Sequence, residues 1–428
     1  MNRDDCLNED SRDPLAPLRA QFSLDRVDRE GVIYLDGNSL GVLPKAAITR
    51  IKDVVETEWG NGLIRSWNSA GWITLAGRIG DKIATLVGAR PGELIVADST
   101  SINLFKALSA SAFAFGYGLT GPFAASKASR ILSEKTNFPT DLYIADTFAR
   151  EQGMELVLVD EPEIRGRLKD GVAILMLTHV NYRTGHMHRM RELTQAAHDA
   201  GAIVVWDLAH SAGAVPIDLH DADADFAIGC GYKYLNGGPG APAFIWAHPR
   251  HTQRMDREGW RPPLSGWLGH AQPFAFDPYY EPANGIQRFI CGTPPVLSLA
   301  ALECGVDAVL AASMDAIRAK SIALTDLFIA LVEDRCAGHG FTLVTPRDSA
   351  ARGSQVSFAH SAEGYAIMQA LIARGVIGDF RAPDILRFGF TPLYTRFIDV
   401  WDAVERMRQV MTSSEWRDPR FSVRAAVT

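Results

Sequence analysis

Short apolar runs alternate with helical patterns through the middle of the chain. Runs rich in Val, Ile and Leu are separated by stretches in which apolar residues recur at helical spacing. The runs predict strands at Glu93–Ala97, Arg130–Ser133, Leu156–Val159, Val172–Leu177, Ala202–Asp207, Phe226–Gly229 and Pro242–Ala247. The helices predicted between them include Asn103–Phe115, Asp141–Gln152 and Met190–Ala200. This alternation predicts an α/β fold with a mainly parallel central sheet flanked by helices.

The pattern changes after the turn Thr293-Pro294-Pro295. A long helical region is expected through Ala301 and Leu324 to Arg335, followed by strands near Phe341, Val356, Val376 and Leu386 and a last helix at Phe397–Met411. We therefore expect a smaller α+β domain over residues 296–428, a large domain over 46–295 and an N-terminal arm over 1–45. A chain of 428 residues is long enough for such a division.

Charge and composition point to a small-molecule ligand. The formal net charge is -7, which provides no basic face for nucleic acid or for acidic lipid. The most apolar stretch, Leu104–Ala125, is interrupted by Lys106, glycines and Pro122, so we interpret it as a buried helix and a loop rather than a membrane span.

The five cysteines are widely spaced and show no paired metal-ligand pattern, so no metal site is expected from them. Reduced thiols fit the cytoplasm. The acidic first residues are followed by no apolar run, so no secretory signal is expected.

Asp207 and Lys233 follow consecutive predicted strands. In an open parallel sheet, ligands bind beyond the carboxyl ends of the strands. A carboxylate there can keep the pyridine nitrogen of pyridoxal 5'-phosphate protonated, which makes the ring an electron sink. A lysine there can hold the cofactor as a Schiff base and then act as a base at the substrate Cα.

His210 comes three residues after Asp207, where it can contact the cofactor and hold the aspartate. Taken singly, a lysine after a strand is usually a solvated group and an aspartate at a strand end is usually a helix cap. Their order, spacing and glycine-rich surroundings favour the cofactor site.

Asp98-Ser99-Thr100-Ser101 precedes the helix predicted near Asn103. Free backbone N–H groups at a helix N-terminus attract anions, so Thr100 and Ser101 are candidate phosphate ligands. Simple N-capping by the same hydroxyl residues is the alternative.

Phe138-Pro139-Thr140-Asp141 precedes another predicted helix. Phe138 can stack on the pyridine face, and Asp141 can bond the ring hydroxyl. An ordinary helix start capped by Asp141 is the alternative.

Arg387 is a single cation in the apolar run Leu386-Arg387-Phe388-Gly389-Phe390. A buried guanidinium needs an anion, and a substrate α-carboxylate could supply one in bidentate fashion. An internal ion pair with Asp384 or Asp379 is the alternative.

These segments resemble the kynureninase family, which consists of pyridoxal 5'-phosphate enzymes of fold type I, the aspartate aminotransferase-like fold. The resemblance covers nearly the whole chain. It is carried by Leu35-Asp36-Gly37-Asn38-Ser39-Leu40-Gly41, Phe138-Pro139-Thr140-Asp141, Asp207-Leu208-Ala209-His210-Ser211, Tyr232-Lys233-Tyr234-Leu235-Asn236, Gly266-Trp267-Leu268-Gly269-His270 and Cys291-Gly292-Thr293-Pro294-Pro295. The Asp207 and Lys233 elements are common to fold type I, whereas the last two segments and the tyrosine before the lysine are more specific.

The resemblance implies hydrolysis of L-kynurenine to anthranilate and L-alanine by a homodimer whose active site is near the interface. It implies cofactor contacts at Thr100, Ser101, Phe138, Pro139, Thr140, Asp141, Thr178, Asp207, His210, Tyr232, Lys233, Trp267 and Thr293. Trp267 and Thr293 are expected to act across the dimer interface, and core packing is the alternative for Trp267. Arg387, Trp72 and Asn38 are the expected substrate contacts.

The implied chemistry gives each of three residues a role. Arg387 holds the substrate carboxylate, Lys233 removes the Cα proton, and Tyr232 carries protons in the later steps. General-base duty requires the pKa of Tyr232 to be lowered from its usual value. Trp67 and Trp72 are candidate walls for the aromatic ring of the substrate. Animal relatives that take a 3-hydroxylated ring have asparagine before the Pro-Pro pair, so Thr293 implies a preference for unsubstituted kynurenine.

Two other classes of function remain open. Another fold type I activity, such as a cysteine desulfurase or an aminotransferase, is one. A desulfurase needs a mobile reactive thiol, and Cys291 is the candidate, although it adjoins a rigid Thr-Pro-Pro turn. A non-catalytic scaffold that binds the cofactor is the other.

Overall fold

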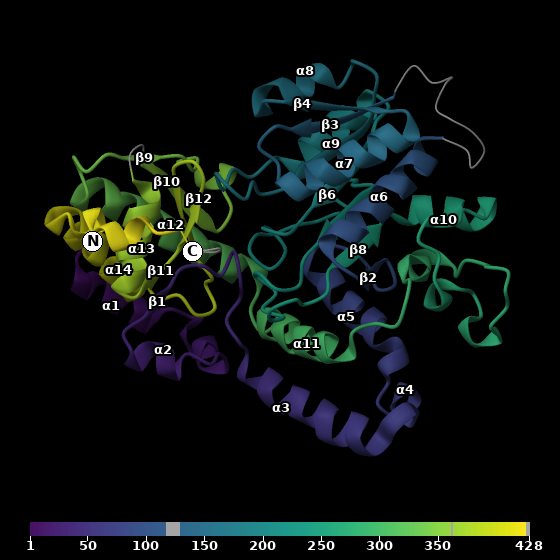
Figure 1. Ribbon diagram of the computed structural model, residues 1–428, viewed down its shortest axis with the longest axis horizontal. Helices are drawn as coiled ribbons and strands as arrows, with labels where there is room; N and C mark the ends of the chain where they lie inside the picture. The colour runs from purple at the N-terminus through teal and green to yellow at the C-terminus, as the bar shows by residue number, and fades with distance from the viewer. Residues whose placement is uncertain (117–128, 361–362, 425–428) are drawn as a thin grey trace.

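The computed structural model describes residues 1–116, 129–360 and 363–424. The described chain forms two lobes (Figure 1). One lobe contains the large sheet, and the other contains the N-terminus together with a smaller sheet. The helix expected from Leu104 is present as far as Phe115, and the loop expected after it lies outside the described residues.

The large sheet has seven strands in the order β2-β8-β7-β6-β5-β3-β4. Their bounds are β2 Leu94–Val96, β3 Arg130–Glu134, β4 Glu155–Val159, β5 Val172–Thr178, β6 Ile203–Asp207, β7 Phe226–Gly229 and β8 Phe244–Ala247. All pairings from β7 to β4 are parallel, and only β8 runs antiparallel to its two neighbours. The predicted fold class is confirmed, and each predicted strand is present with small changes at its ends.

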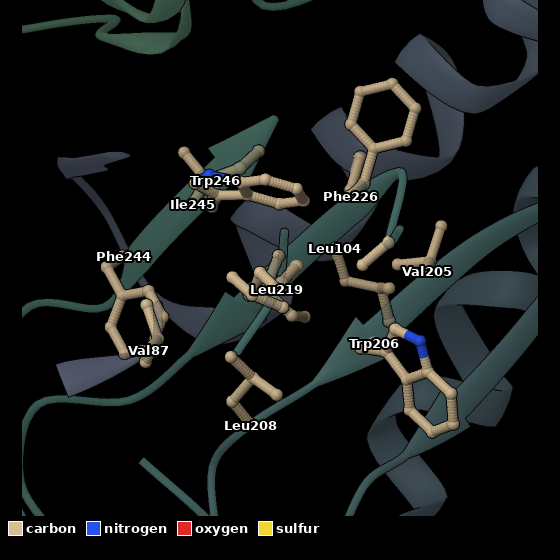
Figure 2. Close-up of a cluster of buried hydrophobic side chains, with 14 of the residues drawn as sticks. Val87, Leu104, Val205, Trp206, Leu208, Leu219, Phe226, Phe244, Ile245 and Trp246 are labelled. Carbon is tan, nitrogen blue, oxygen red and sulfur yellow. The ribbon is translucent and has the colours of Figure 1, made fainter. Parts of the chain in front are cut away.

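Five helices of the large lobe contact the strands of this sheet, namely α5 Trp72–Leu86, α6 Thr100–Phe115, α7 Pro139–Gln152, α8 Ile164–Arg167 and α9 Met190–Asp199. The large lobe also contains α3 Lys45–Asp53, α4 Ser66–Ser69, α10 Pro249–Glu258 and α11 Val296–Leu310. Figure 2 shows Leu104 of α6 among Val205, Trp206 and Phe226 of the sheet. Both faces of the parallel strands are therefore buried, which explains their nearly continuous apolar sequences.

The second lobe has a four-stranded antiparallel sheet in the order β12-β13-β10-β9. Its elements are β9 Phe341–Leu343, β10 Gln355–His360, β11 Val376–Ile377, β12 Asp379–Arg381, β13 Ile385–Gly389, α12 Met314–Arg335, α13 Gly364–Ala373 and α14 Phe397–Ser413. Phe328 of α12 packs against Phe388 and Phe390, with ring centroids 4.9 and 5.2 Å away, and so joins the helix to the sheet.

The N-terminal residues pack onto both lobes. Helix α1 (Arg3–Arg12) contacts α14, strand β1 (Ile33–Tyr34) pairs in parallel with β11, and the short helix α2 covers Asp25–Arg29. In contrast, Phe22 and Leu24 belong to the core of the large lobe. The segment at 1–45 thus connects the two lobes.

The long helical region after Pro295 is two helices, α11 and α12, which meet at 81°. Helix α11 packs on α3 and α5, and Leu299, Leu302 and Val306 belong to the core of the large lobe. The division at residue 295 remains a proposal, and this packing favours a boundary after α11. Within the described residues no single helix is long and apolar enough to span a membrane, although α11 and α12 together, as a bent pair, meet that criterion of length and composition.

Candidate cofactor site

A cavity of about 430 Å³ lies at the carboxyl ends of the parallel strands. This is where ligands bind in open α/β sheets, and the volume suits a small cofactor with its substrate. The cavity brings together the predicted residues Thr100, Ser101, Phe138, Thr140, Asp141, Thr178, Asp207, His210, Tyr232, Lys233 and Thr293. Pro139, Asn38, Trp72, Trp267 and Arg387 are not among the described residues that line it.

Lys233 follows β7 and extends its amine into the cavity. Its Nζ lies 2.7 Å from Nε2 of His210. Burial lowers the pKa of Lys233, and the negative charge of Asp207 opposes that effect only in part. A lysine that loses its proton more readily is a better nucleophile and base.

Asp207 is the last residue of β6, and Asp141 lies in the first turn of α7. Burial raises the pKa of both carboxyl groups, and their mutual repulsion raises that of Asp141 further, whereas Lys233 lowers both. Oδ2 of Asp141 is buried with no hydrogen-bond partner among the described residues. Two buried acids beside one lysine favour a further cation or donor between them.

His210 does not hold Asp207, which corrects one expectation. Oδ1 of Asp207 instead accepts a hydrogen bond of 2.8 Å from the backbone N–H of Ala209. Burial and the adjacent Lys233 keep the pKa of His210 well below its usual value. The imidazole is therefore neutral and directed at the lysine, since its Nε2 contacts Nζ.

The start of α6 is suited to bind an anion. Ser99 is the N-cap and its hydroxyl accepts from the N–H of Ile102, so neither Thr100 nor Ser101 acts as the cap. Both residues line the cavity at the positive end of a helix of 16 residues. Thr100 and Ser101 therefore remain available for a phosphate group.

The segment Phe138–Asp141 forms the N-terminus of α7. Phe138 is the N-cap position without a side-chain cap, and Pro139 occupies the first turn. The alternative that Asp141 caps this helix is therefore wrong. The ring centroid of Phe138 lies 6.0 Å from Nζ of Lys233 and 5.3 Å from that of Tyr182, so the ring forms one wall of the cavity.

The surroundings of Tyr232 raise its pKa, whereas the role of a general base requires a lowered pKa. Burial, followed by the neighbouring Cys230 and Asp207, raises the pKa of Tyr232 above its ordinary value. The phenol therefore keeps its proton at neutral pH, which suits a hydrogen-bond donor rather than a base. Its ring centroid is 5.8 Å from Nζ of Lys233.

Arg387 has an internal partner, as the alternative interpretation allowed. It is 2% exposed, its Nε donates to Oδ1 of Asp379 at 2.8 Å, and its Nη2 contacts Oδ2. Nη1 donates to the carbonyl of Tyr182, and Nη2 donates to the hydroxyl of Ser39. Asp384 pairs with Arg183 instead.

Arg387 and Asn38 lie one layer behind the cavity. Tyr182 lines the cavity and its carbonyl binds Arg387 at 2.7 Å. Asn38 is fully buried, and its amide can accept from Nε of Arg387 at 3.0 Å and donate to Asp36 at 3.3 Å. Two of the three expected substrate contacts, Arg387 and Asn38, thus adjoin the site without lining it.

Trp67, Trp72 and Trp267 form an aromatic cluster outside the cavity. The ring of Trp67 lies 6.4 Å from that of Trp72 and 6.3 Å from that of Trp267, and Nε1 of Trp72 donates to Glu58. Trp67 and Trp72 do not line the cavity of the single chain, so their expected role as walls for the substrate ring stays a prediction. Thr293, by contrast, lines the cavity of its own chain.

Sequence reasoning missed Tyr182 and left Asp379 unresolved. Tyr182 follows the carboxyl end of β5 by four residues, and that position was the available signal. Asp379 and Arg387 are direct partners across β12 and β13. That register selects Asp379 over Asp384, but it depends on strand pairing that the sequence does not specify.

The described residues fit pyridoxal 5'-phosphate. Asp141 has an unpartnered carboxylate oxygen that matches the ring hydroxyl, and the acid of Asp207 matches the pyridine nitrogen. The amine of Lys233 matches the aldehyde carbon, and the start of α6 matches the phosphate. The cavity also has an aromatic wall at Phe138. Donor set and volume therefore agree with this cofactor.

Solved structures with the same fold are fold type I enzymes. A cysteine desulfurase from Thermococcus onnurineus NA1 superposes with a TM-score of 0.74 at 18% identity, over 93% of this chain and 98% of its own. A C-DES mutant with glycine covalently linked to its PLP cofactor gives 0.75 at 18% identity, over 91% and 98%. At this identity the similarity shows the fold alone.

Sequence comparison identifies the family. A family model described as the kynureninase C-terminal domain matches residues 317–407. Kynureninase from Pseudomonas fluorescens is 56% identical over 430 residues, which is 100% of this chain and 99% of the relative. Kynureninase from Burkholderia pseudomallei (strain 1106a) is 55% identical over 429 residues, with the same coverage. The chain belongs to the kynureninase family.

Proposed function

We propose that this chain hydrolyses L-kynurenine to anthranilate and L-alanine, with pyridoxal 5'-phosphate attached to Lys233. One observation carries the proposal: Lys233, Asp207 and the start of α6 meet in one cavity of a chain that belongs to the kynureninase family. When bound, the cofactor supplies a covalent link to the substrate amine and an electron sink.

In this proposal each polar group of the cofactor meets a cavity residue of complementary charge or hydrogen-bonding character. Asp207 keeps the ring nitrogen protonated, and Asp141 accepts from the ring hydroxyl. Thr100 and Ser101 bind the phosphate, with Phe138 against the ring face. The raised pKa of each buried acid supports these roles, because a positive partner or a donor relieves the cost of burial.

Lys233 is the group that moves the proton at the substrate Cα. Its lowered pKa supports this role, since the neutral amine must be available near neutral pH. His210 lies within hydrogen-bond distance of Nζ and carries no charge, so it can direct the amine without adding repulsion. Tyr232, with its retained proton, is proposed as a proton donor rather than a base.

Arg387 is proposed to bind the substrate α-carboxylate, which would take the place of Asp379 on the guanidinium. The guanidinium already makes a two-point contact with Asp379, which is the geometry that a carboxylate ligand would take over. Arg381 also contacts Asp379, so the displaced aspartate would keep a cationic partner. Asn38 and Ser39 would orient the guanidinium during the exchange.

We propose that unsubstituted kynurenine is preferred, because Thr293 lines the cavity at the position where animal relatives that take a 3-hydroxylated ring have asparagine.

Cysteine desulfuration is the rival function, because solved desulfurases share the fold. The candidate thiol, Cys291, donates to the carbonyl of Leu264 at 3.0 Å, and burial raises its pKa. A thiol that is bonded and poorly ionised is a weak nucleophile. These contacts disfavour desulfuration.

We further propose a homodimer located in the cytoplasm. All five cysteines are free thiols, which suits a reducing compartment. Large apolar side chains are exposed between α3 and α5, including Trp59 at 58% and Ile64 at 76%, near the cluster of Trp67 and Trp267. A second copy would cover them and could bring Trp267 to the cofactor of its partner.

Lys233→Ala should lower the rate of anthranilate release from L-kynurenine by about a thousandfold or more, because the proton at Cα loses its acceptor. Anthranilate fluorescence measures the rate. Lys135→Ala, which removes an exposed lysine paired with Asp160, is the matched control and should keep full activity. Release of sulfide from cysteine in place of anthranilate from kynurenine would refute the proposal.

Asp36→Asn should change the pH dependence of KM for kynurenine. Burial and the adjacent Asp379 raise the pKa of Asp36 to about 7, whereas Arg387, Ser39 and Arg381 lower it. Below that pH, Asp36 is neutral and resembles asparagine. Above it, the carboxylate repels the substrate carboxylate at Arg387.

The ratio of KM between the natural protein and Asp36→Asn should be near one at about pH 6 and should rise about fivefold by about pH 8, which corresponds to ~1 kcal/mol of repulsion. Steady-state kinetics at both pH values measure it. A ratio that stays constant with pH would contradict the proposed position of the substrate carboxylate.

Ile64→Asp should weaken the proposed dimer, because it places a charge in an apolar contact. Sedimentation velocity should detect monomer at concentrations at which the natural protein is dimeric, and activity should fall with the dimer. Val423→Asp alters an equally exposed side chain near the C-terminus and should leave the dimer intact. A natural protein that sediments as an active monomer would exclude the proposed dimer.

A further inference from the structure

Two histidines and a glutamate meet outside the cofactor cavity. Glu161 begins a short helical turn after β4, and His186 and His188 lie in the segment between β5 and α9. One ligand atom from each of the three side chains lies within 4.8 Å of the other two. All three line a separate groove of about 260 Å³.

His188 is the buried member of this cluster. It is 3% exposed, and its Nε2 lies 3.0 Å from Oε2 of Glu134, at the end of β3. Its Nδ1 is buried and has no hydrogen-bond partner in the described part of the chain. An unpaired nitrogen in a buried site is costly unless a ligand completes it.

The pairing of His188 with Glu134 resembles the support that metal-binding histidines receive. Such a histidine usually donates its second ring N–H to a carboxylate, which orients the ring and leaves the other nitrogen for the metal. Burial alone would raise the pKa of Glu134, but hydrogen bonds from His188 and Thr136 outweigh it and lower that pKa. Glu134 is therefore an ionised acceptor.

We propose that His186, His188 and Glu161 bind a divalent transition-metal ion of the zinc class, with Glu134 orienting His188. Two imidazoles and one carboxylate are a common zinc ligand set, and water completes the coordination. Ligand atoms at about 2.1 Å from zinc lie about 3.4 Å apart, so the cluster must contract slightly. Glu161 is exposed and can make that movement.

The charges around the cluster permit a cation. Arg165 and Arg189 also border the groove, but both pair with Glu192, at 2.8 and 3.1 Å. Glu192 offsets one of these two positive charges, and the carboxylates of Glu161 and Glu134 lie at the cluster itself.

A metal here would stabilise the contact between the two lobes. His186 forms a bridge with Arg352 of the small lobe, and Met187 donates its N–H to the carbonyl of Ala351 at 2.9 Å. Coordination would tie this segment to Glu161 of the large lobe. The site is therefore structural, and it lies apart from the reacting atoms.

Zinc titration of the cofactor-loaded protein, freed of excess cofactor, tests the proposal. Competition with a chromophoric chelator should give one tight site per chain. His186→Asn and Glu161→Gln should each weaken binding by about tenfold or more. His339→Asn, which removes a histidine from a surface turn, is the control and should bind zinc as the natural protein does.

A second readout separates this site from adventitious binding. Co²⁺ in the same site should give visible d–d bands of low-symmetry four-coordinate geometry, at longer wavelength than the cofactor bands, and Glu161→Gln should lose them. Zn²⁺ should also raise the melting temperature of the natural protein and of His339→Asn, but not that of His186→Asn. Equal zinc affinity in all four proteins, or weak binding by the natural protein, would overturn the proposal.

Discussion

The charge balance among Asp141, Asp207 and Lys233 is the constraint on which the site depends. Asp207 and Lys233, at the ends of neighbouring strands, and Asp141, in the first turn of α7, are buried together, where ionised groups are costly unless each has a partner. One lysine cannot balance two acids. The arrangement favours a ligand that has a protonatable nitrogen and a hydroxyl, whereas burial makes the lysine easier to deprotonate.

The segment at 35–41 connects that site to the small lobe. The N–H of Gly41 donates to the carbonyl of Tyr232, and a Cβ on Gly41 would collide with the carbonyl of Lys233. In the same segment Ser39 contacts both Asp379 and Arg387. The loop that carries the lysine and the strand that carries the arginine are therefore both in contact with one stretch of chain.

Much of the fold could be predicted from the sequence, because strands buried on both faces appear as continuous apolar runs. Asp207 and Lys233 could be paired because both follow neighbouring parallel strands. Features that depend on pairing between distant segments could not be predicted. The partner of Arg387 is set by strand register, Trp72 bonds to Glu58 and does not line the cavity of the single chain, and the cluster of His186 and His188 needs Glu161 from another part of the chain.

Peptide mapping after borohydride reduction tests the central claim most directly. Reduction fixes a cofactor that is joined to a lysine through a Schiff base, and mass spectrometry identifies the peptide that carries the added pyridoxyl group. The account predicts this modification on Lys233 alone, at one per chain. Modification of Lys106 or of any other lysine in its place, or no fixed cofactor at all, would contradict it.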